Sequence, residues 1–189
     1  MSGFHEGTIG GHRLVLPVGT KSLLFGAHGV LWHPTLVFVA WWKLYGFPRD
    51  PRLWLAFVIH DWGYWGCPNM DGPEGEVHPL LAARLMKRWF GPGWGQFCAC
   101  HSRHWSRIVG LSPSRLCWAD KWAAVMLPPW MYVPSALASG ELHEYMADAA
   151  RRETLHGERN VQFAQTPIAW YRDVQRFLRR EVEEAILKR

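Results

Sequence analysis

Residues 55–63 read LAFVIHDWG, and this stretch decides the fold that we expect. An apolar run ends there in an imidazole and a carboxylate, His60 and Asp61, followed by an aromatic residue and a glycine. Apolar runs are buried, and a buried carboxylate is costly unless its charge is compensated. Where histidines are close by, a metal ion is the usual compensation. The pair therefore predicts a metal site at the end of a buried helix.

The composition is that of one domain. The chain has 189 residues, of which 49% are hydrophobic, including 13 Trp and 9 Phe, and this is enough to bury a substantial core. Its longest apolar run, at 36–42, is far shorter than the roughly 20 residues needed to span a bilayer. The N-terminus lacks a basic region followed by an apolar one, so we expect no signal peptide. We expect a single cytoplasmic domain over residues 1–189, without a membrane partner.

Charge and cysteine usage exclude two further classes. The formal net charge is +5, but the basic residues near the C-terminus alternate with acidic ones, which is typical of a solvated helix face. We therefore expect no stable nucleic-acid partner, although the mild basicity would attract small anions. The four cysteines, which are Cys67, Cys98, Cys100 and Cys117, are too few for a disulfide framework and lack paired Cys-x-x-Cys spacing. They are expected to be core thiols.

The hydrophobic periodicity is mostly helical, with few alternating runs that would indicate strands. Capping residues and prolines mark several helix starts, such as Asp50 before Pro51. The glycine-containing stretch 62–77 is expected to be a loop. The expected helices are 33–45, about 51–60, 78–90, 97–104, 112–127, about 141–156 and 167–187. The sequence thus predicts an all-α fold.

Five more potential ligands lie on or beside these expected helices, namely His33, His78, His101, His104 and Asp120. In helical bundles, metal sites are built from side chains that project inward from facing helices. Histidine nitrogen and carboxylate oxygen together suit first-row divalent metals. The expected cofactor is one or two divalent ions, either Mn, Co, Zn, Ni, Fe or Mg, with the identity left open.

The order of these residues resembles the HD-domain superfamily. A histidine opens the helix in HPTLVFVA (33–40), the adjacent pair His60-Asp61 follows, and a late aspartate stands in ADK (119–121). His78 in VHPLLAA and His101 in CHS are similar to the extra ligands of two-metal members. The resemblance covers about 25–130 and implies an HD-domain helical bundle, with C-terminal helices at about 141–187 packing on that core.

The resemblance also implies roles. It makes His33, His60, Asp61 and Asp120 the expected ligands of one divalent ion. His78 and His101 would bind a second ion, with Asp61 as a bridge, or contact a substrate phosphate. His104 is one helical turn from His101 and could replace it. The candidate catalytic residues are Asp61, Glu74, Glu76, His78 and His101.

One position departs from the family pattern. Many nucleotidases of the superfamily have a catalytic carboxylate three residues after the His-Asp pair, where this chain has Tyr64. The general acid is therefore left open, and Glu74 or Glu76 could serve from the following loop. Trp62 and Trp65 would either stack on a nucleobase or pack internally. The candidate phosphate contacts are Arg84, Arg103, Arg107 and Lys121.

Members of the superfamily are mostly metal-dependent phosphohydrolases. The resemblance therefore implies cleavage of a phosphate ester or anhydride by a metal-activated water, with a small, nucleotide-like phosphorylated substrate. Three alternatives stay open: a two-metal cyclic-nucleotide phosphodiesterase, a di-iron oxygenase that uses six ligands, and a non-enzymatic metal-binding module. The oligomeric state is also open, because the apolar side of 167–187 could pack internally or on a second copy.

Overall fold

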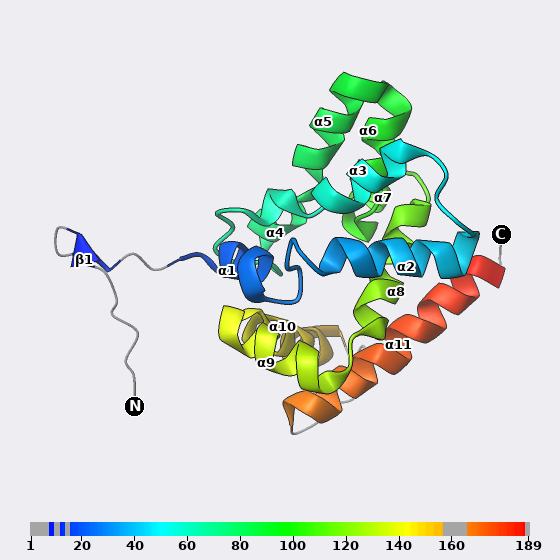
Figure 1. The fold of residues 1–189 in the computed structure, drawn as a ribbon. Helices are drawn as coiled ribbons and strands as arrows, with labels where there is room; N and C mark the ends of the chain where they lie inside the picture. The colour runs from blue at the N-terminus through cyan, green and yellow to red at the C-terminus, as the bar shows by residue number, and fades with distance from the viewer. Residues whose placement is uncertain (1–7, 10–11, 14–15, 157–165, 188–189) are drawn as a thin grey trace.

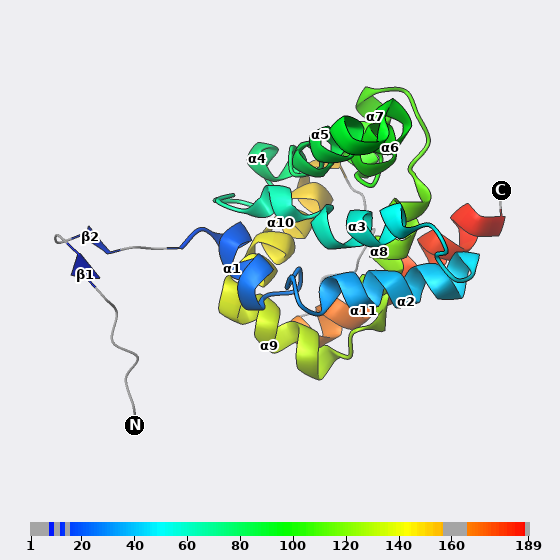
Figure 2. The ribbon, with the colours of Figure 1, turned by 45° about the horizontal axis from the view of Figure 1, so that its top comes forward.

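The computed structural model describes residues 8–9, 12–13, 16–156 and 166–187 and belongs to the all-α class (Figure 1). Its helices are α1 (Val18–Phe25), α2 (His33–Tyr45), α3 (Pro51–Ile59), α4 (Pro73–Glu76), α5 (Pro79–Phe90), α6 (Pro92–Ala99), α7 (Arg103–Ile108), α8 (Arg115–Met126), α9 (Pro129–Ser139), α10 (Glu141–His156) and α11 (Pro167–Leu187). A 3₁₀ turn, η1 (Trp62–Tyr64), follows α3. The strands of the described residues, β1 (Thr8–Ile9) and β2 (His12–Arg13), form a short antiparallel hairpin apart from the helices (Figure 2).

Most of the predicted helices are present, and local chemistry explains their ends. The Asp50 side chain accepts a hydrogen bond from the Arg52 backbone N–H at 2.9 Å and so caps α3. Gly91 has a φ of 90°, which lets the chain leave α5 and enter α6 directly. The helices predicted at 33–45 and 167–187 are confirmed at both ends to within about two residues.

Two predictions about helices were wrong. The single helix expected at 97–104 is broken, because Ser102 has extended backbone angles and its hydroxyl accepts hydrogen bonds from the first N–H groups of α7. The segment between the helices expected at 112–127 and about 141–156 was not predicted to be helical, but Pro129 begins α9 there, since a proline at the first helical position loses no hydrogen bond. Helix α1 was not among the predicted helices.

Two large apolar clusters form most of the interior, and a third, of four buried residues, joins α1 to the segment after α3. The larger cluster joins α2, α3, α5, α6 and α8, with α8 packed against α2 on one side and α11 on another. The smaller cluster joins α9, α10 and α11 around Tyr132 and Tyr171, whose rings stack at 3.8 Å. The Tyr171 hydroxyl donates to the backbone oxygens of Ala124 and Leu127, which holds α11 against the end of α8. The C-terminal helices therefore pack on the central helix.

The four cysteines are buried and unpaired, as predicted. Burial raises the pKa of the Cys117 thiol to about 11, so it stays protonated at neutral pH. Within the described residues, every helix is too short or too polar to cross a membrane.

Candidate metal centre

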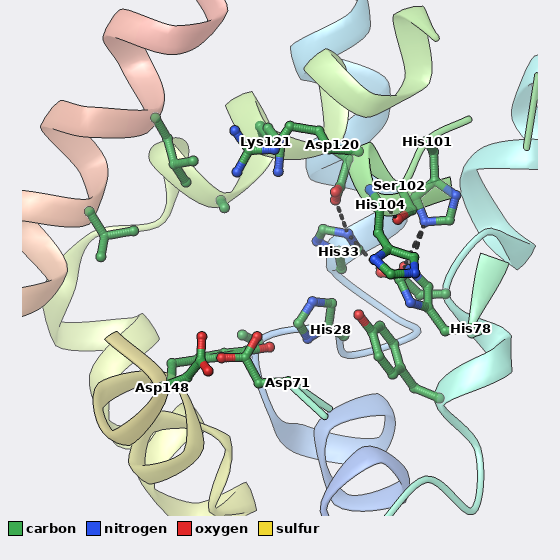
Figure 3. A pocket seen from close by; sticks show the side chains of 18 of the residues that line it. His28, His33, Asp71, His78, His101, Ser102, His104, Asp120, Lys121 and Asp148 are labelled. Carbon is green, nitrogen blue, oxygen red and sulfur yellow. Dashed lines mark hydrogen bonds and ion pairs between the residues drawn. The ribbon is translucent and has the colours of Figure 1, made fainter. Parts of the chain in front are cut away.

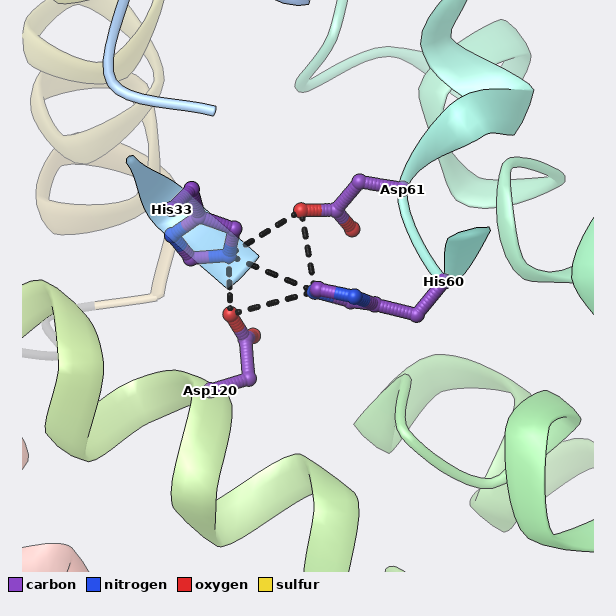
Figure 4. Close-up of side chains that lie close together, drawn as sticks. All are labelled: His33, His60, Asp61 and Asp120. Carbon is purple, nitrogen blue, oxygen red and sulfur yellow. Dashed lines mark hydrogen bonds and ion pairs between the residues drawn. The ribbon is translucent and has the colours of Figure 1, made fainter. Parts of the chain in front are cut away.

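Four predicted ligands converge from three parts of the bundle (Figure 4). His33 is the first residue of α2, His60 and Asp61 follow the end of α3, and Asp120 lies within α8. His33 Nε2 is 2.9 Å from Asp120 Oδ1 and 3.3 Å from Asp61 Oδ2. His60 Nε2 is 3.1 Å from Asp61 Oδ2 and 3.3 Å from His33 Nε2. All four donor atoms lie within 4.8 Å of one another, so this group could hold a metal ion.

A second group shares Asp61 with the first. His78 precedes α5, and His101 lies between α6 and α7. The Nε2 atoms of these two histidines are 3.0 Å apart. Asp61 Oδ1 is 3.5 Å from the Nε2 of His101 and 3.8 Å from the Nε2 of His78. Asp61 therefore turns one carboxylate oxygen toward each group. The structure brings together all six residues that the resemblance names as ligands.

Backbone carbonyls fix the orientation of three of the imidazoles. In each of these rings, Nδ1 faces the backbone oxygen of the residue three positions earlier. The distance is 3.0 Å for His60 and Phe57, 2.6 Å for His78 and Gly75, and 2.6 Å for His101 and Cys98. A carbonyl oxygen can only accept, so each Nδ1 carries a proton, and Nε2 is the nitrogen that each ring turns toward the cluster. Where both of these rings are neutral with the proton on Nδ1, the 3.0 Å approach of His78 Nε2 to His101 Nε2 sets two lone pairs face to face. A cation between them would relieve this repulsion.

Asp61 gives a second, independent sign of cation binding. Its Oδ2 atom is buried and lacks a hydrogen-bond donor of suitable geometry among the described residues, although two imidazole nitrogens lie within 3.3 Å. A buried carboxylate oxygen without a donor is costly. An ion placed among these atoms would compensate the carboxylate and accept the imidazole lone pairs. The donor set of nitrogens and oxygens therefore fits a divalent metal.

The protonation of the cluster is consistent with proton–metal exchange. Burial alone would lower the pKa of His60, but the charge of Asp61 and the contacts with Asp120 outweigh it and raise the pKa to about 10. Burial and the neighbouring His101 lower the pKa of His78 to about 3, so this ring is neutral at neutral pH. Burial would raise the pKa of Asp61, but the charge of His60 and the other imidazoles lower it well below its ordinary value. Bound metal would take the place of the proton on His60, because imidazole coordinates in its neutral form.

The cluster opens into a pocket of about 460 Å³ (Figure 3). All the ligands except His60 are among the residues that line it. Basic and acidic side chains share its polar part, which includes Arg103, Arg107, Lys121, Glu76 and Asp148. Its other wall is apolar, and it is formed mainly by Leu127, Trp170, Val174, Phe177 and Leu178. A ligand with a charged end and an apolar body would fit this division.

Three comparisons with known proteins found no match. No family model, no curated protein and no solved structure matches this chain. The function therefore has to be inferred from the geometry and chemistry of the site.

The structure distinguishes between His101 and His104. His101 is buried within the second group, whereas the His104 side chain is 38% exposed and has its Nδ1 3.7 Å from Glu76 Oε1. The two residues were expected to share one helix, but the break at Ser102 separates them. His104 still lines the pocket, on the side of Glu76.

The other predicted site residues divide between the pocket and the surface. Glu76, Arg103, Arg107 and Lys121 line the pocket, whereas Glu74 and Arg84 are not among its lining residues. Glu74 is exposed on α4. Trp62 and Trp65 also lie outside the lining and are 41% and 65% exposed. The structure therefore does not bring the two tryptophans to the place where a bound ligand could stack on them.

Tyr64, three residues after Asp61, lines the pocket. Its ring stacks on that of His78, with centroids 4.0 Å apart and planes 15° apart. Burial and the nearby carboxylates raise its pKa well above the ordinary value, so the phenol stays protonated. Tyr64 thus supports the His78 ring and presents a neutral side chain to the pocket.

One pocket residue, His28, was missed by the sequence analysis. It lies in the connection between α1 and α2, and its ring centroid is 5.5 Å from that of His33. Its partner is Glu141, which is 113 positions away in the chain. The only signal in the sequence is a histidine within a glycine-containing turn shortly before His33, and this is too common to identify a site residue.

Proposed function

We propose that this protein is a metal-dependent phosphohydrolase of the HD-domain type, which cleaves a phosphate ester or anhydride of a nucleotide-like substrate. The observation that carries the proposal is the pair of donor groups joined by Asp61 in the wall of a pocket with basic side chains. The order of the ligands along the chain, which resembles that of the superfamily, supports the same activity. A divalent ion held by these groups would supply a Lewis acid and would lower the pKa of a water molecule.

The basic side chains of the pocket would bind the phosphate. Lys121 follows Asp120 on α8, and Arg107 lies on α7. Neither forms an ion pair with another described residue, whereas Arg103 is paired with Glu181. Hydrolysis at phosphorus depends mainly on positioning and on neutralising charge. We therefore assign Lys121 and Arg107 to binding of the phosphate oxygens.

The apolar wall favours an organic substrate over inorganic phosphate alone. Val174, Phe177 and Leu178 on α11 face the pocket together with Leu127 at the end of α8. A ring system such as a nucleobase would bury apolar surface there while its phosphate faces the donor groups. We therefore assign contact with the nucleobase to this apolar wall and not to Trp62 and Trp65.

The proton for the leaving group is assigned to Glu76. Of the two candidates from the sequence, Glu74 and Glu76, only Glu76 is among the residues that line the pocket. A carboxyl group can donate or accept a proton when it lies within reach of the reacting oxygen. Replacing Glu76 with Gln should therefore lower kcat more than it raises KM.

The decisive experiment combines metal analysis with a nucleotide panel. Protein loaded separately with each candidate ion is assayed for release of phosphate and of pyrophosphate, with cyclic nucleotides included. Asp120→Ala should lose bound metal and lose activity by at least about a hundredfold, because His33 Nε2 lies 2.9 Å from this carboxylate. Glu183→Gln, which alters an exposed carboxylate on α11, is the control. Full activity in Asp120→Ala would exclude the proposed mechanism.

A second candidate is a di-iron oxygenase. The observation that favours it is the bridging position of Asp61, since a carboxylate between two groups of histidines also suits a pair of iron ions. Iron in the purified protein, with oxygen consumption and no release of phosphate, would favour this activity over hydrolysis. Both activities need open coordination positions, and the exposure of the ligands to the pocket favours either over a closed structural site.

A further inference from the structure

A second buried carboxylate lies close to the pocket. Glu141, the first residue of α10, is completely buried. Its Oε1 accepts hydrogen bonds from the Ala27 backbone N–H at 2.6 Å and the Ser139 hydroxyl at 2.9 Å. Its Oε2 accepts from the Ser22 hydroxyl at 2.6 Å and is 3.1 Å from His28 Nδ1. The carboxylate therefore holds the turn that carries His28.

The backbone of this turn allows the close approach. A Cβ atom at Gly26 would lie 2.6 Å from Glu141 Oε1 and 2.5 Å from the Ser22 Cα. Glycine is therefore required at this position for the carboxylate to reach the Ala27 N–H. Burial would raise the pKa of Glu141, but its hydrogen bond with His28 and the charge of that ring lower it, so the group is ionised.

These contacts fix which nitrogen of His28 faces the pocket. An ionised carboxylate only accepts, so His28 Nδ1 carries the proton that points to Glu141. The Ser22 oxygen, 3.0 Å from the same Nδ1, is a second acceptor for it. His28 Nε2 forms no hydrogen bond with any described residue. The ring orientation is thus set on one side, and its other nitrogen is left for a ligand.

The position of the ring is next to the metal-ligand cluster but outside it. The His28 side chain is 20% exposed and lines the pocket, beside His33 and Tyr64 (Figure 3). It belongs to neither of the two donor groups. Three other donors already bind Glu141, so burial of this carboxylate does not by itself require a histidine at the pocket wall.

We propose that His28 contacts the substrate, donating a hydrogen bond from Nε2 to an oxyanion bound at the metal-ligand cluster, and that Glu141 is the residue that positions it. The inference rests on the proposed function, because the oxyanion is the phosphate to be hydrolysed. A donor at this point would stabilise negative charge that develops on the phosphoryl or leaving-group oxygen.

The charge on the ring agrees with this role. Burial lowers the pKa of His28, but the hydrogen bond to Glu141 and the charges of Asp61, Glu141 and Asp120 raise it to about 9. The contact of Nδ1 with the Glu141 carboxylate favours the protonated ring, in which Nε2 is a donor. The contribution of Glu141 to the raised pKa of His28 does not depend on whether Asp61 and Asp120 bind a cation.

The test uses inorganic phosphate as the probe, titrated by calorimetry into metal-loaded protein at a fixed neutral pH. In His28→Asn, the amide can replace Nδ1 toward Glu141 but has no atom in the place of Nε2. In His28→Gln, the amide nitrogen can reach the place of Nε2. His143→Asn, on the exposed side of α10, is the matched control.

We expect His28→Asn to bind phosphate at least tenfold more weakly than the wild type, and His28→Gln to recover part of the affinity. The metal content should be unchanged in both variants, and His143→Asn should behave as the wild type. Glu141→Gln, where it folds, should weaken phosphate binding, and combining it with His28→Asn should add little.

Three results would overturn the assignment of His28. They are wild-type phosphate affinity in His28→Asn, loss of metal from that variant, and absence of phosphate binding by the wild type. Hydrolysis of the nucleotide panel is measured on the same preparations. A wild type that hydrolyses nucleotides while His28→Asn retains phosphate affinity would refute the role of His28 and leave the proposed function standing.

Discussion

At the scale of single residues, Asp61 links the two donor groups, because Oδ2 faces His33 and His60 while Oδ1 faces His78 and His101. The second group has only three donors, so loss of one imidazole should abolish binding there. We expect His101→Ala to lower the number of metal ions bound per chain, as measured by elemental analysis. His104→Ala should leave that number unchanged. The opposite pattern would mean that the wrong histidine is assigned to the cluster.

Glu141 gives a pH dependence with a definite sign. Its pKa is lowered in the folded protein from an ordinary value of 4.5, so it contributes stability above pH 4.5 that is lost as the pH falls below this value. Glu141→Gln removes the contribution and should lower the free energy of unfolding near neutral pH by about 2 kcal/mol. Urea unfolding of both proteins at several pH values would measure this. The difference should shrink below pH 4.5, and a difference that stays constant would show that Glu141 is not ionised.

Four of the ligand residues could be predicted from a local signal, whereas Asp120 and His101 were expected from the family resemblance. His33 and His78 stand at helix starts before a proline, and His60-Asp61 ends an apolar run. The pair formed by His28 and Glu141 could not be predicted, since its contact depends on how α10 packs against the turn after α1. The choice between His101 and His104 required knowing that Ser102 caps a new helix.

At the scale of elements, the site depends on how closely η1 lies against the residue before α5. A Cβ atom at Gly63 would be 2.0 Å from the backbone oxygen of His78, so the two segments are in contact through backbone atoms. Gly63→Ala must separate them and shift His78 away from Asp61. We expect a loss of about 3 kcal/mol in the free energy of unfolding and weaker metal binding.

Gly93→Ala is the matched control for that substitution. Gly93 lies in α6, and a Cβ atom there would meet nothing within 4 Å. An alanine should be neutral or stabilise the helix by up to about 1 kcal/mol. Thermal unfolding and metal titration of both variants would check the contrast. Equal effects of the two substitutions would rule out the close contact between η1 and His78.

The helix ends show where sequence reasoning is limited at this scale. Apolar periodicity located the long helices that form the larger cluster. It did not separate α6 from α7, because Cys98 and His101 continue the apolar and polar pattern through the break. It also placed α9 outside the helices, because a proline pair is ambiguous: it can close one helix or open the next.

At the scale of the whole molecule, the candidate metal centre connects segments that are distant in sequence. Its ligands come from the start of α2, the end of α3, the start of α5, the break after α6, and the middle of α8. The apolar clusters of the described residues are formed without any of these side chains. We therefore expect the metal-free protein to remain folded but to be less stable than the metal-bound form.

Metal addition should raise the melting temperature of the whole domain in a concentration-dependent way, because an ion that binds only the folded chain stabilises it by mass action. At a free ion concentration about 100 times Kd the gain is about 2.7 kcal/mol, which for a chain of this size corresponds to roughly 5–10 °C. Calorimetric melting in a chelator and in increasing Mn, Co or Zn would measure the shift. Asp120→Ala should melt near the temperature of the metal-free wild type and respond little to added metal, since its remaining ligands cannot complete the first group. A wild-type melting temperature that no divalent ion changes would contradict the metal centre and, with it, the hydrolytic function proposed for the pocket.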